Sequence, residues 1–280
     1  MVLILFEIQL NDGLKIPALG FGTYTLNGIY GLEILKRAVQ NGYNLIDSAF
    51  NYENEGMIGK AVKEVSVSRD KLIITSKLPG RHHSYKEAVQ TIEESLFRAG
   101  LDYYDIYLIH WPNPRINLYV EAWQALIEAK KRGIVRSIGV CNFLPEHIER
   151  LVKETGVVPS INQIELHPYF NQEAQRKYNK EHNIVTESWS PLGRGKSVFK
   201  EKIVEKLALK YNKSASQIVL RWQIQLGNVP IPKANSTGHQ IENINIFDFE
   251  LSNDEINAMN SITRDCGRIK NQDPAVYEEF

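Results

Sequence analysis

Short apolar runs alternate with longer amphipathic stretches along this 280-residue sequence, and their number constrains the fold more than any other feature. Eight runs are almost continuously apolar, which is typical of parallel strands buried on both faces. They cover residues 19–22, 45–48, 72–77, 106–110, 137–141, 161–166, 185–189 and 229–231. A doubly wound open sheet has the same alternation of strands and helices, so the number of strands decides between the two folds. Eight strands, each followed by a helix, predict an α/β fold of the (β/α)8 TIM-barrel type.

The amphipathic stretches are the predicted helices, because their apolar residues recur at helical spacing. They cover residues 32–41, 55–65, 85–99, 119–132, 145–153, 174–182, 200–211 and 216–226, and we interpret 240–245 followed by 252–259 as the last helix. An N-terminal β-hairpin is expected within residues 1–17, because alternating segments flank the turn-forming Asn11-Asp12-Gly13. Residues 263–280 contain Gly267 and Pro274 and show little periodicity, so we expect an ordered C-terminal loop.

The length fits one barrel of roughly 250 residues or two smaller domains. Because no stretch resembles a linker, we predict a single domain over residues 1–280. The 33 basic and 33 acidic residues cancel, which indicates neither a nucleic-acid nor a membrane partner but leaves a local basic pocket possible. The apolar run 2–6 is too short for a signal peptide or a membrane span, and we interpret it as the lead into a strand. Only two cysteines, Cys141 and Cys266, are present and far apart, so we expect a cytoplasmic protein without a structural metal site.

Three titratable residues stand at the C-terminal ends of consecutive predicted strands. They are Asp47, Lys77 and His110, and their spacings of 30 and 33 residues correspond to one strand–helix unit each. Tyr52 follows Asp47 closely enough for a loop to fold it back over the same point. Barrel enzymes place their chemistry at this rim. Taken singly, each residue could be a helix cap, a solvated strand end or a packed core side chain, but a shared rim favours a functional site.

These four side chains suit the reduction of a carbonyl group. Hydride transfer to the carbonyl carbon leaves charge on the oxygen, which then needs a proton. A phenol has an ordinary pKa of about 10, and a nearby ammonium lowers it. We therefore predict Tyr52 as the proton donor, Lys77 as the group that lowers its pKa, and Asp47 as the partner that holds Lys77 charged. His110 would orient the substrate oxygen, and no metal is required.

Ordered motifs through nearly the whole chain resemble the aldo-keto reductases. They are Gly20-Phe21-Gly22-Thr23-Tyr24, Asp47-Ser48-Ala49 with Tyr52-Glu53-Asn54-Glu55, Ser76-Lys77-Leu78, Leu108-Ile109-His110-Trp111-Pro112, Ser137 to Phe143, Asn162 to Pro168, Trp189-Ser190-Pro191-Leu192-Gly193 and Ile231-Pro232-Lys233. Asp47, Tyr52, Lys77 and His110 look like the tetrad of that family. The likeness is greatest to its microbial branch, described as 2,5-diketo-D-gluconate reductase-like, whose members reduce varied aldehydes and ketones.

The resemblance implies NADPH bound across the barrel mouth, which fits the absence of a Gly-x-Gly-x-x-Gly fingerprint. Asn142 and Gln163 would hold the carboxamide, Trp189 would stack on the nicotinamide, and residues 190–193 would lie along the pyrophosphate. The adenosine end would lie on residues 233–243. The full set of implied cofactor contacts is Gly22, Thr23, Tyr24, Asp47, Cys141, Asn142, Gln163, Trp189, Ser190, Pro191, Leu192, Gly193, Ile231, Pro232, Lys233, Ala234, Asn235, Ser236, His239, Glu242 and Asn243.

Three positions depart from the usual pattern of that family. Ala234 stands where Ser is usual after Lys233, and His239 stands where Arg is usual. Loss of a hydroxyl and of a permanent, bidentate cation weakens the grip on a 2′-phosphate. We therefore expect NADPH to bind with less discrimination against NADH, and with a pH dependence due to His239. Cys141 replaces Ser beside Asn142, which weakens one hydrogen bond near the carboxamide.

The substrate pocket is expected to have aromatic walls from Tyr24, Tyr52 and Trp111 beside His110. Such a pocket suits small aldehydes, dicarbonyls or keto-sugars and does not discriminate among them. We interpret residues 81–83 after the third strand as a solvated loop. The resemblance implies a monomer.

Two rival hypotheses remain open for the rim. Lys77 could be a Schiff-base lysine of a barrel aldolase, although Asp47 would oppose its neutral form. The barrel could instead be a redox-sensing binding subunit, although all four residues of the tetrad are present. A metal-dependent hydrolase is excluded, because the first predicted strand lacks the His-x-His typical of such sites.

Overall fold

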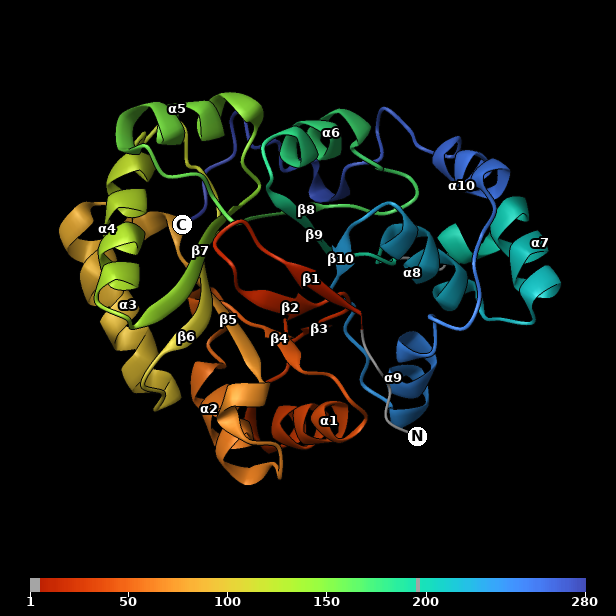
Figure 1. The fold of residues 1–280 in the computed structure, drawn as a ribbon, viewed down its shortest axis with the longest axis horizontal. Coiled ribbons are helices and arrows are strands. Elements are labelled where there is room, and N and C mark those ends of the chain that lie inside the picture. The colour runs from red at the N-terminus through yellow and green to blue at the C-terminus, as the bar shows by residue number, and fades with distance from the viewer. Residues whose placement is uncertain (1–5, 195–196) are drawn as a thin grey trace.

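A computed structural model describes residues 6–194 and 197–280, and at its centre is a sheet of eight parallel strands (Figure 1). The strands pair in chain order, and they are β3 (Phe21–Gly22), β4 (Leu45–Asp47), β5 (Ile73–Leu78), β6 (Tyr104–Ile109), β7 (Val135–Cys141), β8 (Ile161–Glu165), β9 (Val185–Trp189) and β10 (Val229–Pro230). The first and last strands also meet. The Gly20 N–H donates to the Pro230 carbonyl at 3.0 Å, and the Gly22 N–H donates to the Pro232 carbonyl at 3.2 Å. These bonds close the ring and confirm the predicted barrel.

Helices surround the ring, as the periodicity predicts (Figure 1). Those in the described part of the chain are α1 (Gly28–Gln40), α2 (Glu55–Glu64), α3 (Tyr85–Ala99), α4 (Tyr119–Lys131), α5 (Pro145–Thr155), α6 (Glu173–Glu181), α7 (Lys202–Tyr211), α8 (Ala215–Gln225), α9 (Thr237–Ile244) and α10 (Asn253–Asn260). The prediction of one final helix was wrong. The backbone leaves the helical conformation at Asn245, and Ser252 starts α10 anew by accepting a hydrogen bond from the Glu255 N–H.

The N-terminal hairpin covers the end of the barrel at which the parallel strands begin, opposite the end that carries their C-termini. Its strands are β1 (Glu7–Gln9) and β2 (Lys15–Pro17), which pair antiparallel with Ile8 opposite Ile16. Leu10 and Ile16 are buried and pack with side chains from the barrel interior, among them Leu45, Ile106 and Val229. The predicted hairpin is thus confirmed from residue 6 onward, and the expected lead into it, residues 2–5, lies outside the described residues.

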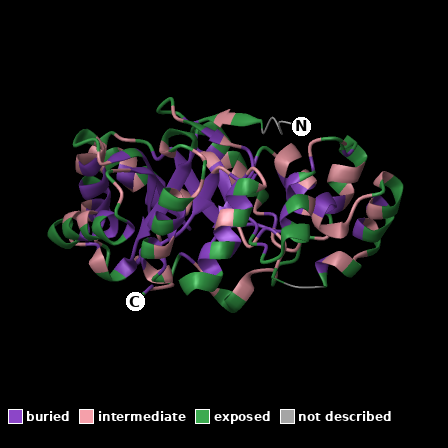
Figure 2. Ribbon diagram, turned by 90° about the horizontal axis from the view of Figure 1, so that it is seen from below, coloured by how far each residue is buried: buried purple, intermediate pink, exposed green. Residues whose placement is uncertain are grey.

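Burial follows the layers of the barrel. The strands are buried, and the outward faces of the helices are exposed (Figure 2). One close helix contact depends on a glycine: a Cβ on Gly59 of α2 would overlap the carbonyl group of Ala99 at the end of α3. Of the helices in the described ranges, none is long and apolar enough to cross a membrane.

Candidate active site

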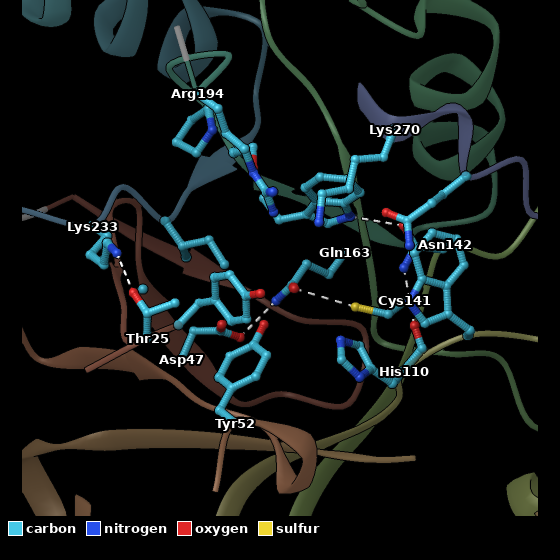
Figure 3. A pocket seen from close by; sticks show the side chains of 18 of the residues that line it. Thr25, Asp47, Tyr52, His110, Cys141, Asn142, Gln163, Arg194, Lys233 and Lys270 are labelled. Carbon is cyan, nitrogen blue, oxygen red and sulfur yellow. Dashed lines mark hydrogen bonds between the residues drawn. The ribbon is translucent and has the colours of Figure 1, made fainter. Parts of the chain in front are cut away.

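The C-terminal ends of three neighbouring strands bring Asp47, Lys77 and His110 together. Tyr52 joins them from a 3-10 turn, η1 (Phe50–Tyr52), which directly follows β4. Asp47, Tyr52 and His110 line a cavity of about 530 Å³ at this end of the barrel (Figure 3). Lys77 is fully buried next to the ring of Tyr52. The ring centroids of Tyr52 and His110 are 5.9 Å apart. The three residues predicted from their strand-end positions and Tyr52 from the following loop therefore share one site.

Lys77 is held by two oxygens. Its Nζ donates to Asp47 Oδ1 at 2.6 Å and to the Ser48 carbonyl at 2.8 Å. Burial alone would lower the pKa of Lys77, but the carboxylate of Asp47 outweighs burial and leaves the pKa raised. Lys77 thus remains an ammonium, and its Nζ lies 5.1 Å from the centroid of the Tyr52 ring. The expected pairing of Asp47 with Lys77 is present.

The pKa of Tyr52 is set by burial and by the neighbouring charges. Burial raises this pKa above its ordinary value. The ammonium of Lys77 does act to lower the pKa, and the negative charge of Asp47 works against it. The net effect is a phenol that keeps its proton. Lys77 therefore acts on Tyr52 in the predicted direction, and it limits the rise in pKa that burial causes.

A second buried carboxyl group lies behind the first. Gln163 Nε2 donates to Asp47 Oδ1 at 2.8 Å and to Glu187 Oε2 at 2.6 Å. Glu187 is fully buried, and its pKa is raised to about 8 by burial first and then by the negative charge of Asp47. The thiol of Cys141 donates to Gln163 Oε1 at 3.3 Å. The amide of Gln163 is thus fixed by three neighbours at the base of the cavity.

Asn142 connects His110 to Trp189. It follows β7 with φ of +62°, a left-handed conformation that asparagine adopts more readily than most residues. From there Asn142 Nδ2 donates to the His110 carbonyl at 3.0 Å, and Trp189 Nε1 donates to Asn142 Oδ1 at 2.8 Å. The two residues expected to contact a nicotinamide group therefore support each other and the loop of His110.

The predicted cofactor contacts divide into two groups. Those that line the cavity are Gly22, Tyr24, Asp47, Cys141, Asn142, Gln163, Trp189, Ser190, Pro191, Leu192, Ile231, Pro232 and Lys233. Those outside its lining are Thr23, Gly193, Ala234, Asn235, Ser236, His239, Glu242 and Asn243. Several of this second group have partners within the protein. The Thr23 hydroxyl donates to the Asp47 carbonyl at 2.8 Å, Ser236 caps α9, and Glu242 accepts hydrogen bonds from Ser214 and Ser216.

Sequence reasoning missed part of the lining. The missed residues are Thr25, Arg194, Lys270, Gln272, Tyr277 and Glu279, and four of them belong to the C-terminal segment that was expected only to be an ordered loop. This segment crosses the mouth of the cavity, where the ring centroids of Tyr277 and Trp111 are 4.4 Å apart. No periodic pattern marks it in the sequence. The expected solvated loop was also wrong at His83, whose side chain is buried and whose pKa burial lowers to about 4.

The lining of the cavity combines aromatic side chains with cations, and this combination fits a dinucleotide. Trp189 and Tyr24 offer ring faces, and the amide of Asn142 offers polar atoms. Arg194, Lys233 and Lys270 have no carboxylate within 4.0 Å among the described residues, so their charges are available to an anion. Within residues 6–194 and 197–280 no cluster of three or more His, Cys, Asp or Glu side chains could hold a metal ion.

Comparison with known proteins places this geometry in context. A sequence model of the Aldo/keto reductase family matches residues 18–264. The chain is 47% identical over 273 residues to 2,5-diketo-D-gluconic acid reductase B of Corynebacterium sp. (strain SHS752001), and the alignment covers 98% of each. It is 44% identical over 268 residues to methylglyoxal reductase DkgA of Escherichia coli (strain K12), over 95% of this chain and 96% of that protein. A crystal structure of a Gox0644 variant in complex with NADPH superposes with a TM-score of 0.93 at 39% identity, covering 98% of this chain and 99% of that one.

Proposed function

The chain belongs to the aldo/keto reductase family, and from this premise we propose that it reduces aldehydes or ketones to alcohols with NADPH, using Tyr52 as the general acid. Family membership makes the protein an oxidoreductase. One observation carries the assignment of the acid. The Asp47–Lys77 pair is buried beneath the ring of Tyr52, at the base of a cavity that His110 also lines.

The protein side of the reaction is a proton transfer. A carbonyl oxygen bound between the Tyr52 hydroxyl and the His110 imidazole gains negative charge as its carbon is reduced. Tyr52 then gives its proton to that oxygen, and the alcohol forms. The phenolate left behind would be costly in a buried cavity, but the Lys77 ammonium beside it offsets that cost. Asp47 keeps Lys77 charged, so the phenolate forms next to a fixed cation.

The residues of the cavity also support the choice of cofactor. Trp189, Asn142 and Gln163 would hold the nicotinamide end, and Arg194 with Lys233 would hold the phosphates. NADPH, when bound, supplies the hydride that reduces the carbonyl carbon. A similar chain binds NADPH in its crystal structure, which favours this cofactor here.

The substrate is proposed to be a small carbonyl compound. The two curated relatives are named for 2,5-diketo-D-gluconic acid and for methylglyoxal, which both carry adjacent oxygen functions on a short chain. Tyr24 and Trp111 wall the cavity and would pack against such a chain. A Schiff-base mechanism is less well supported, because that reaction needs a neutral lysine and Asp47 raises the pKa of Lys77.

The experiment follows the absorbance of NADPH with methylglyoxal and with an aromatic aldehyde. Wild type should turn over, and Tyr52→Phe should lose about two or more orders of magnitude in kcat. Tyr30→Phe is the matched control, because Tyr30 is 66% exposed on α1 and should leave the rate unchanged. Equal rates in wild type and Tyr52→Phe would disprove the assigned proton donor. Cofactor binding without any turnover would favour a binding subunit.

A further inference from the structure

Glu279 carries a buried carboxylate that the reaction described above does not use. It lies in the C-terminal segment at the cavity mouth and is only 8% exposed. Its Oε1 lies 2.7 Å from His110 Nδ1 and accepts a hydrogen bond from Asn51 Nδ2 at 2.8 Å. Its Oε2 accepts a hydrogen bond from the Gly80 N–H at 2.9 Å. A buried carboxylate with this many polar partners is a built site rather than a surface contact.

The backbone of Glu279 is fixed to the same loop that carries His110. The Glu279 N–H donates to Asn113 Oδ1 at 3.0 Å, and Asn113 Nδ2 donates to the Glu279 carbonyl at 2.8 Å. Asn113 follows His110 by three residues, so the imidazole and the carboxylate are positioned by one short stretch of chain. Gly80 leaves the space that this contact needs, because a Cβ there would overlap the side-chain amide of Asn113.

The charges around Glu279 leave His110 as its principal partner. Arg81 binds the other side of the Asn51 amide, and His83 is buried and uncharged near neutral pH because burial lowers its pKa to about 4. The neighbouring Glu278 turns away, accepting a hydrogen bond from the Arg115 N–H at 2.7 Å. Burial raises the pKa of Glu279, but His110 and the donors of Gly80 and Asn51 outweigh burial and leave the pKa lowered. Glu279 is therefore an anion when it meets the imidazole.

The groups that face His110 from the other elements do not compete for Nδ1. Tyr52 faces it with its ring at 5.9 Å, and Lys77 is already bound to Asp47. Cys141 stays a neutral thiol, because burial raises its pKa. Asn142 reaches only the backbone carbonyl of His110. Glu279 is thus the charged side chain in direct contact with this ring among the described residues.

We propose that Glu279 is a positioning residue for His110, which holds the imidazole through Nδ1 and keeps it protonated so that Nε2–H faces the substrate oxygen. A neutral imidazole whose Nδ1–H donates to Glu279 has only an acceptor at Nε2. Such a nitrogen cannot hydrogen-bond a carbonyl oxygen, which is also an acceptor. The carboxylate favours the imidazolium, which donates from both nitrogens. In other carboxylate–histidine pairs, too, the carboxylate fixes the protonation and the orientation of the imidazole ring. This inference rests on the role of His110 in the proposed function.

The test removes the charge of Glu279 and keeps its shape. Protein labelled with 15N-histidine is titrated by NMR for wild type, Glu279→Gln, Glu279→Asp and the neighbour control Glu278→Gln, with the signal of His110 identified from His110→Asn. In Glu279→Gln the pH at which His110 loses its proton should fall by about one unit or more, a tenfold change in the proton equilibrium. Glu279→Asp should recover most of the shift, and Glu278→Gln should match wild type. Equal thermal melts would show that each variant is folded.

The kinetic arm uses the same variants over pH 6 to 9. In Glu279→Gln, kcat at pH 8 should fall about tenfold, the alkaline limb of the kcat profile should move to lower pH, and KM should change little. A raised KM with an unmoved pH profile would mean that the segment merely loosens, and would overturn the inference. If the titration of His110 does not change in an active enzyme, the role proposed for Glu279 is overturned and the proposed function stands. If the wild type reduces no carbonyl compound, the proposed function is overturned as well.

Discussion

Lys77 Nζ lies 2.6 Å from Asp47 Oδ1, and both side chains are withdrawn from solvent at the base of the cavity. Neither charge is stable there alone, because an isolated ion loses several kcal/mol of hydration on burial. In the ion pair, each residue therefore stabilises the buried charge of the other. Its stability and its chemistry can be separated by changing one partner or both.

Asp47→Asn should destabilise the fold and abolish turnover. The substitution leaves the Lys77 ammonium buried without a counter-charge, which costs about 3–5 kcal/mol. Asp47→Asn combined with Lys77→Met removes both charges and should recover most of the free energy of unfolding, while the enzyme stays inactive. Urea denaturation and NADPH turnover measure the two effects. Equal unfolding free energies for the single and the double variant would contradict the argument.

The choice between NADPH and NADH should depend on Ala234, which lies shortly before α9, and on His239, which lies in the first turn of α9. An imidazole does not offer the permanent charge and the bidentate donors of a guanidinium. Ala234→Ser with His239→Arg should therefore raise the ratio of kcat/KM for NADPH over NADH about tenfold, roughly 1.4 kcal/mol. NADH, which lacks the 2′-phosphate, is the internal control, and a wild-type preference of several hundredfold at every pH would disprove the idea.

The buried Glu187 should make the protein less stable as the pH rises. Its pKa is about 8 in the folded chain and near 4.5 when unfolded, so between these values the folded state binds the extra proton. Stability then falls as the pH rises through this window and the carboxyl group must ionise. Glu187→Gln keeps the shape without the charge, and its melting temperature should exceed that of wild type more at pH 8.5 than at pH 6.5. A difference independent of pH would speak against this account.

Gly59→Ala should destabilise the fold although alanine is the better helix former. In an exposed helix interior this change would stabilise by about 1 kcal/mol, but here the new Cβ would overlap the carbonyl group of Ala99. We expect a loss of about 2 kcal/mol or more in the free energy of unfolding. Gly238→Ala in α9 is the matched control, because nothing lies within 4 Å of its Cβ position. Equal effects of the two substitutions would show that α2 and α3 can move apart.

The barrel and the base of the site could be predicted because both follow from local pattern. Each strand is a short apolar run, and the position of a residue at a strand end places it at the rim of the ring whatever the loops do. Asp47, Lys77 and His110 were found in this way. Tyr52 required the further expectation that its loop turns back, and η1 provides that turn.

The mouth of the cavity could not be predicted, because its contacts join residues that no pattern relates. Glu279 meets Gly80 and Asn113 only after the C-terminal segment has passed from the end of β8, where the Ile269 N–H donates to Glu165, to the loops after β5 and β6. Irregular segments have no period, so neither their course nor their partners can be read from spacing. The sequence indicates which charge lies near Tyr52, but not how far burial raises the pKa of its phenol.

The closure of the ring has a consequence for how the chain folds. The Gly20 and Gly22 N–H groups bond the carbonyls of Pro230 and Pro232, so the seam of the barrel joins opposite ends of the sequence. Closing so large a loop costs chain entropy before its contacts repay it, and such non-local pairing slows folding. We therefore expect the seam to form late, after neighbouring strands have paired in sequence. An open, crescent-shaped intermediate would expose the unpaired edges of β3 and β10. Two incompletely folded chains would pair and aggregate through these edges.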